Sequence, residues 1–115
     1  MPSLHTLQHS IDDKNWLERC LQTVQNNDAI LLLEDAVSIS CHLPSLKLLS
    51  ELTSVSLFVL DADCQARGIN PTYDAALALS ASEVIDLKAY AAFKKVSYQE
   101  FVELSLSYDK VINWA

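Results

Sequence analysis

Two apolar runs that end in acidic residues constrain the fold of this chain more than any other feature. Residues 30–33 are followed by Glu34 and Asp35, and residues 55–60 are followed by Asp61. A strand with one exposed face alternates polar and apolar residues, whereas a strand covered on both faces is almost continuously apolar. Each run also follows a segment with helical spacing. We therefore predict a small α/β domain whose parallel sheet has helices on both faces.

The length and composition predict a single domain, 1–115, in a reducing, cytoplasmic setting. Half of the 115 residues are hydrophobic, which is typical of a globular chain. The apolar stretches fall short of the roughly 20 residues that cross a bilayer, and the N-terminus does not resemble a secretory signal. The three cysteines are widely spaced and form no metal or redox motif. We expect no membrane association and no metal site.

The charge of the chain argues against phosphate ligands. The formal net charge is -7 and the sequence pI is about 4.7, so phosphates and anionic membrane surfaces would repel the domain. Gly68 is the only glycine, which excludes a glycine-rich phosphate loop. We therefore predict no cofactor and no direct contact with nucleic acid.

The expected elements follow from apolar spacing and from turn residues. Strands are expected at 4–7, 30–33, 55–60, 93–97 and 110–114. Helices are expected after an N-cap at Ser10, at 44–52, from Asp61 to Gly68 and at 98–107, with a short helix or loop at 36–41. Residues 72–93 are mostly helical in character, although 84–87 also fits a strand. In the helix at 98–107, Phe101, Val102, Leu104 and Leu106 are expected to be buried.

Five short pieces of the sequence occur in the order seen in one protein family. They are 4–7 (LHTL), 31–37 (LLLEDAV), 65–69 (QARGI), 98–104 (YQEFVEL) and 109–114 (DKVINW). Their order, the total length and the tryptophan near the end resemble the DsrH/TusB family of sulfur-relay subunits over nearly the whole chain. Two departures stand out. Residues 70–93 form a longer segment than usual, and Ala36 replaces a glycine common in the family.

The resemblance implies a flavodoxin-like, DsrEFH-like fold and a role in a sulfurtransferase complex. Such subunits assemble with TusC/DsrF-like and TusD/DsrE-like paralogues into a hetero-oligomer that passes persulfide sulfur to a TusE/DsrC-like acceptor. The Tus version serves 2-thiolation of the tRNA wobble uridine, and the Dsr version serves dissimilatory sulfur oxidation. We favour the Tus role because it is the more widespread. The catalytic relatives carry a cysteine near the end of the third strand, where this chain has Val59, Leu60 and Asp61, so we do not expect the main catalytic subunit.

Cys20 is the candidate sulfur-carrying, catalytic cysteine. The string at 16–21 (WLERCL) is similar to DsrH-type members, which have a cysteine at this point. The same residue falls on the apolar face of its predicted helix, where a small hydrophobic side chain is the usual occupant. Both interpretations stay open from the sequence, the buried one being favoured.

The other two cysteines are weaker candidates. Cys64 follows Asp61 in a short helix, where Arg67 would lower the thiol pKa and the neighbouring acids would raise it. We favour a structural role for it. Cys41 stands next to His42, but adjacent residues usually face different ways.

A rival interpretation is a stand-alone flavodoxin-like signalling domain that binds a metal or ligand. Glu34, Asp35 and Asp61 stand where open α/β sheets build such sites, although they also fit simple helix capping. His5 and His9 are expected to be surface or hydrogen-bonded residues. The aromatic residues near the C-terminus, Phe101, Tyr108 and Trp114, suggest either a subunit interface or self-burial.

Overall fold

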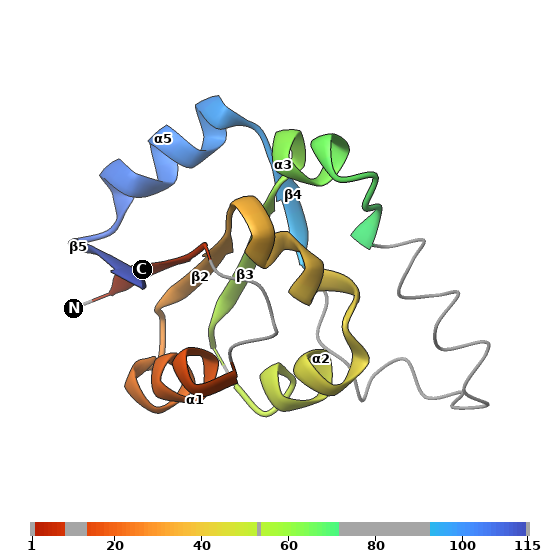
Figure 1. Cartoon of the computed structure of the whole chain (residues 1–115). Coiled ribbons are helices and arrows are strands. Elements are labelled where there is room, and N and C mark those ends of the chain that lie inside the picture. The colour runs from red at the N-terminus through yellow and green to blue at the C-terminus, as the bar shows by residue number, and fades with distance from the viewer. Residues whose placement is uncertain (1, 9–13, 53, 72–92, 115) are drawn as a thin grey trace.

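The computed structural model describes residues 2–8, 14–52, 54–71 and 93–114 (Figure 1). The described elements, in chain order, are β1 (Ser3–Leu7), α1 (Lys14–Thr23), β2 (Ala29–Leu32), the 3-10 helix η1 (Glu34–Cys41), α2 (Leu43–Leu49), β3 (Ser56–Leu60), α3 (Asp61–Ala66), β4 (Lys94–Val96), α5 (Tyr98–Ser107) and β5 (Lys110–Trp114). The predicted Ser10 cap and the segment 72–92 lie outside the described residues.

The five strands form one sheet in the order β4-β3-β2-β1-β5, and every pair is parallel. This confirms the predicted small α/β, flavodoxin-like fold. The chain lays β1 to β4 side by side in one direction and then returns to place β5 against the free side of β1. Leu4, for example, pairs with Ala29 of β2 on one side and with Val111 of β5 on the other. Among the strands that the structure describes, β4 and β5 are therefore the two edges.

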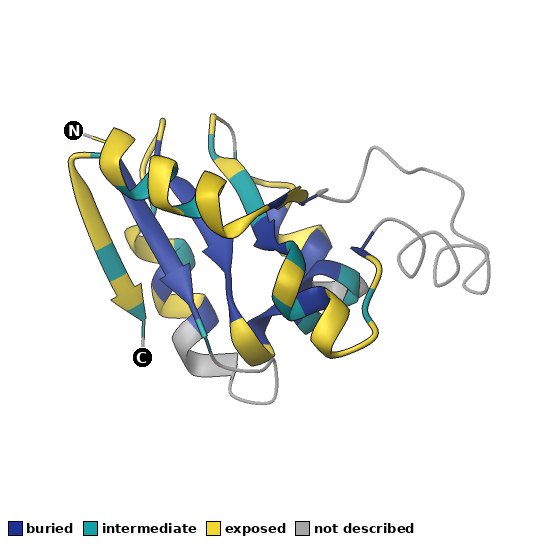
Figure 2. Cartoon of the chain, turned by 90° about the horizontal axis from the view of Figure 1, so that it is seen from above, coloured by how far each residue is buried: buried dark blue, intermediate teal, exposed yellow. Residues whose placement is uncertain are grey.

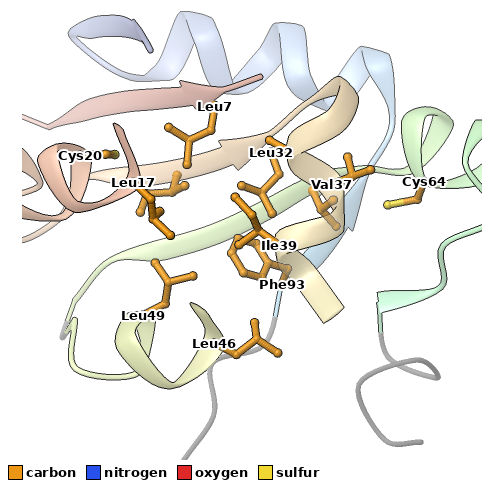
Figure 3. Packing of buried hydrophobic residues seen from close by; sticks show 13 residues of the cluster. Leu7, Leu17, Cys20, Leu32, Val37, Ile39, Leu46, Leu49, Cys64 and Phe93 are labelled. Carbon is orange, nitrogen blue, oxygen red and sulfur yellow. The ribbon is translucent and has the colours of Figure 1, made fainter. Parts of the chain in front are cut away.

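The two faces of the sheet are covered unequally. On one face, α1, η1, α2 and α3 bury a large apolar cluster that includes Leu7, Leu32 and Val59 (Figure 3). On the other face, α5 is the helix among the described ones that packs on the sheet, against Leu4 and Leu31. Figure 2 shows α5 and β5 largely exposed while β1 is buried along its whole length. The continuous apolar runs of the sequence thus reflect strands covered on both sides.

Local sequence explains where the short helices begin and end. Gly68 has a φ of 65°, a conformation that glycine adopts without steric cost, and the next residue's N–H returns to the Cys64 carbonyl at 2.8 Å. The expected end of α3 at Gly68 is therefore confirmed. At the start of α3, Asp61 is the first helical residue and not the N-cap, because Leu60 occupies that position. The Asp61 carboxylate instead accepts a hydrogen bond from Gln65 Nε2 at 2.9 Å.

The bounds of α5 were predicted correctly, but its buried face was not. Phe101 and Leu104 are half-buried against the sheet, whereas Val102 and Leu106 are 55% and 81% exposed. A step of one residue turns the helix by about 100°, so positions 101 and 102 cannot face the same surface. The prediction that Val102 and Leu106 are buried was wrong.

Candidate functional site

Glu34 and Asp35 follow β2, and Asp61 follows β3, so these acidic residues lie at the carboxyl ends of the two neighbouring strands. Glu34 follows β2 with a φ of 50°, in the left-handed region. Its backbone N–H donates to Asp63 Oδ2 at 2.7 Å, which links the start of η1 to α3. The acidic residues therefore help to join two helices at the sheet end.

Arg67 occupies the space beside these carboxylates. Its Nη2 and Nε lie 3.1 and 3.2 Å from Asp35 Oδ1, and its Nη1 lies 3.9 Å from Asp63 Oδ1. Such exposed ion pairs contribute about 0–1 kcal/mol to stability. Within the part of the chain that the structure describes, no group of three or more His, Cys, Asp or Glu side chains is placed to hold a metal ion.

Cys64 has the surroundings of a structural cysteine. Cys64 is fully buried in α3. Burial, followed by the charge of Asp61, raises the pKa of its thiol to about 11, and Lys95 acts in the opposite direction. The thiol is therefore un-ionised at neutral pH, as a structural cysteine would be.

Cys20 is also fully buried, on the sheet-facing side of α1 (Figure 3). Burial, with a smaller contribution from Asp28, raises the pKa of its thiol to about 12. A nucleophilic relay cysteine needs a thiolate that solvent or a partner can reach. The packing fits the small-hydrophobe interpretation, and a sulfur-carrying role for Cys20 stays a prediction.

Cys41 and His42 do not form a pair in the way their adjacency suggests. The half-buried Cys41 thiol donates to the Ser38 carbonyl at 3.3 Å. His42 is the N-cap of α2, and its Nδ1 accepts from the Ser45 N–H at 3.4 Å and lies 2.8 Å from Ser45 Oγ. The His42 imidazole therefore caps the N-terminus of α2.

A buried polar network lies at the opposite end of the sheet, around Asp28. This carboxylate accepts hydrogen bonds from the backbone N–H of Ser3 at 2.8 Å and of Gln25 at 3.0 Å, and from His5 Nε2 at 2.9 Å. Burial by itself would raise the pKa of Asp28, but these hydrogen bonds outweigh it and the pKa is lowered. Asp28 is thus a buried, ionised residue with well-satisfied oxygens.

Trp114 fixes the tautomer of the histidine in this network. Its indole Nε1 donates to His5 Nδ1 at 3.0 Å, and the two rings stack with centroids 6.2 Å apart. Because an indole N–H can only donate, Nδ1 must accept and the ring proton must sit on Nε2, facing Asp28. His5 is hydrogen-bonded, as expected, but it is buried and not at the surface; His9 lies outside the described residues.

A cavity of about 310 Å³ adjoins this network at the amino ends of β1 and β5. Ser3, His5, Asp28 and Lys110 are among the residues that line it. Neither the network nor the cavity was predicted from the sequence. The available signal was Asp28, an acid placed directly before an apolar run.

Comparison with protein families identifies the chain. The family model described as "DsrH like protein" matches residues 9–111. The chain belongs to the DsrH-like family. No curated protein matches it. Membership in the DsrH-like family implies a role in sulfur relay within a multi-subunit complex.

The span matched by the family model covers some of the residues described above and leaves out others. It includes all three cysteines and Asp28, whereas His5 and Trp114 lie just outside its two ends. None of the helices described for this DsrH-like chain is long and apolar enough to span a membrane.

Proposed function

We propose that this chain is a subunit of a cytoplasmic TusBCD/DsrEFH-like sulfurtransferase complex that relays persulfide sulfur toward 2-thiolation of the tRNA wobble uridine. The observation that carries the proposal is the DsrH-like match over residues 9–111. Its partners would be a TusC/DsrF-like subunit, a TusD/DsrE-like subunit and a TusE/DsrC-like acceptor. The net charge of -7 supports contact with proteins, leaving tRNA to a separate enzyme.

The state of the thiols supports an assisting role for the chain. Sulfur transfer requires a thiolate to attack the outer sulfur of a persulfide and release the donor thiolate. Burial raises the thiol pKa of Cys20 to about 12, so the group is protonated at pH 7. Cys64 is little better, with a pKa of about 11. The chain would therefore complete the assembly and help to dock the acceptor, while a sister subunit supplies the main reactive cysteine.

Cys20 remains the candidate if this chain carries sulfur itself. The presence of Cys20 favours the second candidate function, a DsrH-type role in sulfur oxidation, because residues 16–21 resemble DsrH-type members, which have a cysteine at this point. Cys20 packs against the sheet, so α1 would have to move for a persulfide to reach it. Mass spectrometry after exposure of the assembled complex to a persulfide donor tests this: sulfane sulfur on a sister cysteine alone would exclude Cys20.

Deletion of the gene for this chain tests the main proposal. We expect the 2-thiouridine content of tRNA, measured by liquid chromatography and mass spectrometry, to fall strongly and to recover when the chain is supplied again. Unchanged 2-thiouridine together with impaired oxidation of stored sulfur would overturn the tRNA role in favour of the Dsr role.

A further inference from the structure

Among the described residues, two hydrogen bonds between side chains tie edge strand β5 to β1, one on each face of the sheet. On the face covered by α5, Thr6 Oγ1 donates to Asn113 Oδ1 at 2.9 Å. On the face covered by α1, Trp114 Nε1 donates to His5 Nδ1 at 3.0 Å. Figure 2 shows β5 on the outer side of β1, and its pairing with β1 is the one that the described sheet gives it. Of the two side-chain bonds, only the second uses a titratable group.

The bond between Trp114 and His5 exists in one protonation state of the imidazole. An indole N–H can only donate, so Nδ1 accepts it only while Nδ1 carries no proton. A second proton on the ring gives an imidazolium, in which both nitrogens are donors. Two N–H groups would then face each other across 3.0 Å, and the hydrogen bond would be lost.

The other ring nitrogen lies in surroundings that favour the imidazolium. Asp28 Oδ2 is 2.9 Å from His5 Nε2. Although burial acts to raise the pKa of Asp28, the hydrogen bonds that it accepts lower the pKa overall, so the carboxylate is ionised. An opposite charge at this distance favours the charged form of a histidine, whereas burial of the ring opposes it. A second proton on His5 therefore strengthens one contact of the ring while it breaks the other.

Few other charges face the His5 ring. The neighbouring strand β2 has the sequence AILL and no titratable side chain, and the charged residue of β5 is Lys110, which lines the same cavity and opposes a second positive charge. In α1, Cys20 faces the sheet, but burial, with a smaller contribution from the nearby carboxylate, raises the pKa of its thiol to about 12, so it is neutral. Glu18 and Arg19 of the same helix are exposed.

The cavity of about 310 Å³ gives protons a route to this ring. His5 is buried, but it lines the cavity together with Thr23, Gln25 and Lys110. A polar cavity of this size is large enough to admit water. Trp114 is half-buried, so part of its side chain already borders solvent.

We propose that His5 is a proton-operated latch on edge strand β5: a second proton on its imidazole strengthens the contact with Asp28, releases the indole of Trp114 and loosens the end of β5. The proton comes from water in the cavity, and the lone pair of Nδ1 binds it. The indole N–H loses this acceptor and turns toward solvent. The latch does not depend on the proposed function, because every group in it belongs to this chain. Histidine suits such a role because its charge ordinarily changes between about pH 5 and pH 8.

Nuclear magnetic resonance of the nitrogen-labelled wild-type protein, titrated from about pH 8 to about pH 5, tests the latch. We expect one transition shared by two signals: His5 Nδ1 gains a proton, and the indole N–H signal of Trp114 shifts with the same midpoint. The chain has two tryptophans, so Trp114→Phe identifies the signal by removing it. Below the midpoint, the amide protection factors of β5 should fall about fivefold relative to those of β2 and β3, which is the effect of one hydrogen bond.

Two substitutions should move the midpoint of the His5 transition in opposite directions. Trp114→Phe removes the donor that opposes the second proton, so the midpoint should rise. Asp28→Asn removes the charge that favours the second proton, so the midpoint should fall. Each shift should be about half a pH unit or more. Asn113→Ala is the matched control, because it removes the bond to Thr6 on the other face of the same strand and should leave the midpoint in place.

Three results would overturn the proposal. The first is a His5 Nδ1 that stays unprotonated in the folded protein down to about pH 5. The second is protonation of His5 without movement of the Trp114 signal, and the third is an Asn113→Ala midpoint displaced as far as that of Trp114→Phe. If circular dichroism shows that a variant is unfolded, the wild-type titration decides, because both of its signals come from the unaltered chain.

Discussion

Trp114 donates its indole N–H to His5 Nδ1 at 3.0 Å, between residues 109 positions apart in the sequence. The bond joins edge strand β5 to β1 and leaves the Nε2 proton of His5 pointing at Asp28. One chain of hydrogen bonds therefore runs from the last described strand, through β1, to the residue that precedes β2.

Replacing Trp114 by phenylalanine should destabilise the fold by about 1–2 kcal/mol, because His5 Nδ1 then lacks its donor in a buried place. Equilibrium denaturation in urea measures the effect. Val111→Ala is the control, since it changes the same strand at an exposed position and should cost less. Equal stability of Trp114→Phe and wild type would show that the bond contributes nothing.

Asp28 should make stability depend on pH in the acid range. Its pKa in the folded protein lies below the ordinary value of 3.8, so the folded state binds protons less readily than the unfolded state. This contribution is fully present above the unfolded pKa and is lost as the pH falls through the folded pKa. The free energy of unfolding, measured from pH 6 down, should fall less steeply below about pH 4 in Asp28→Asn than in the wild type. Parallel curves would contradict the role assigned to Asp28.

The three cysteines should differ in their reaction with iodoacetamide. Cys20 and Cys64 are fully buried and their raised pKa values keep them protonated, so they should label slowly in the native protein. Cys41 is half-buried and should label faster. Peptide mass spectrometry of native and urea-unfolded samples gives the site-specific rates. Native Cys20 that labels as fast as it does in urea would mean that α1 opens readily.

Ser97→Ala should cost about 1 kcal/mol of stability. Ser97 Oγ accepts from the Glu100 N–H at 3.1 Å, and Glu100 Oε1 accepts from the Ser97 N–H at 3.0 Å, which forms the capping box of α5. Ser107→Ala is the control at the other end of the helix, where the hydroxyl only donates to the Glu103 carbonyl. The two melting temperatures give the comparison, and a Ser107→Ala variant as unstable as Ser97→Ala would contradict it.

The elements of the fold followed closely from local sequence patterns. The apolar runs predicted β2 and β3 because burial on both faces leaves no alternation of polar residues. Gly68 marked the end of α3 because few other residues adopt a φ of 65° there. The burial of Val102 and Leu106 was predicted wrongly because the pattern of α5 contains two apolar faces, and only packing decides which one meets the sheet.

The candidate site was much harder to predict. Glu34, Asp35 and Asp61 could be placed at one end of the sheet because parallel strands share a direction. The contact of His5 with Trp114 depends instead on β5 lying next to β1 and not next to β4. The position of β5 in the sheet is determined by long-range packing, and no local spacing in the sequence predicts it.

The return of β5 to β1 has a consequence for how the protein is made. A ribosome must add about a hundred residues after β1 before the strand that completes its pairing emerges, which takes about 5–20 seconds at about 5–20 residues per second. During that time, the backbone N–H and C=O groups of β1 that later pair with β5 can form hydrogen bonds only with water or with a protein that binds the nascent chain. Chaperones and translation pauses are therefore expected to matter more for this molecule than its small size suggests.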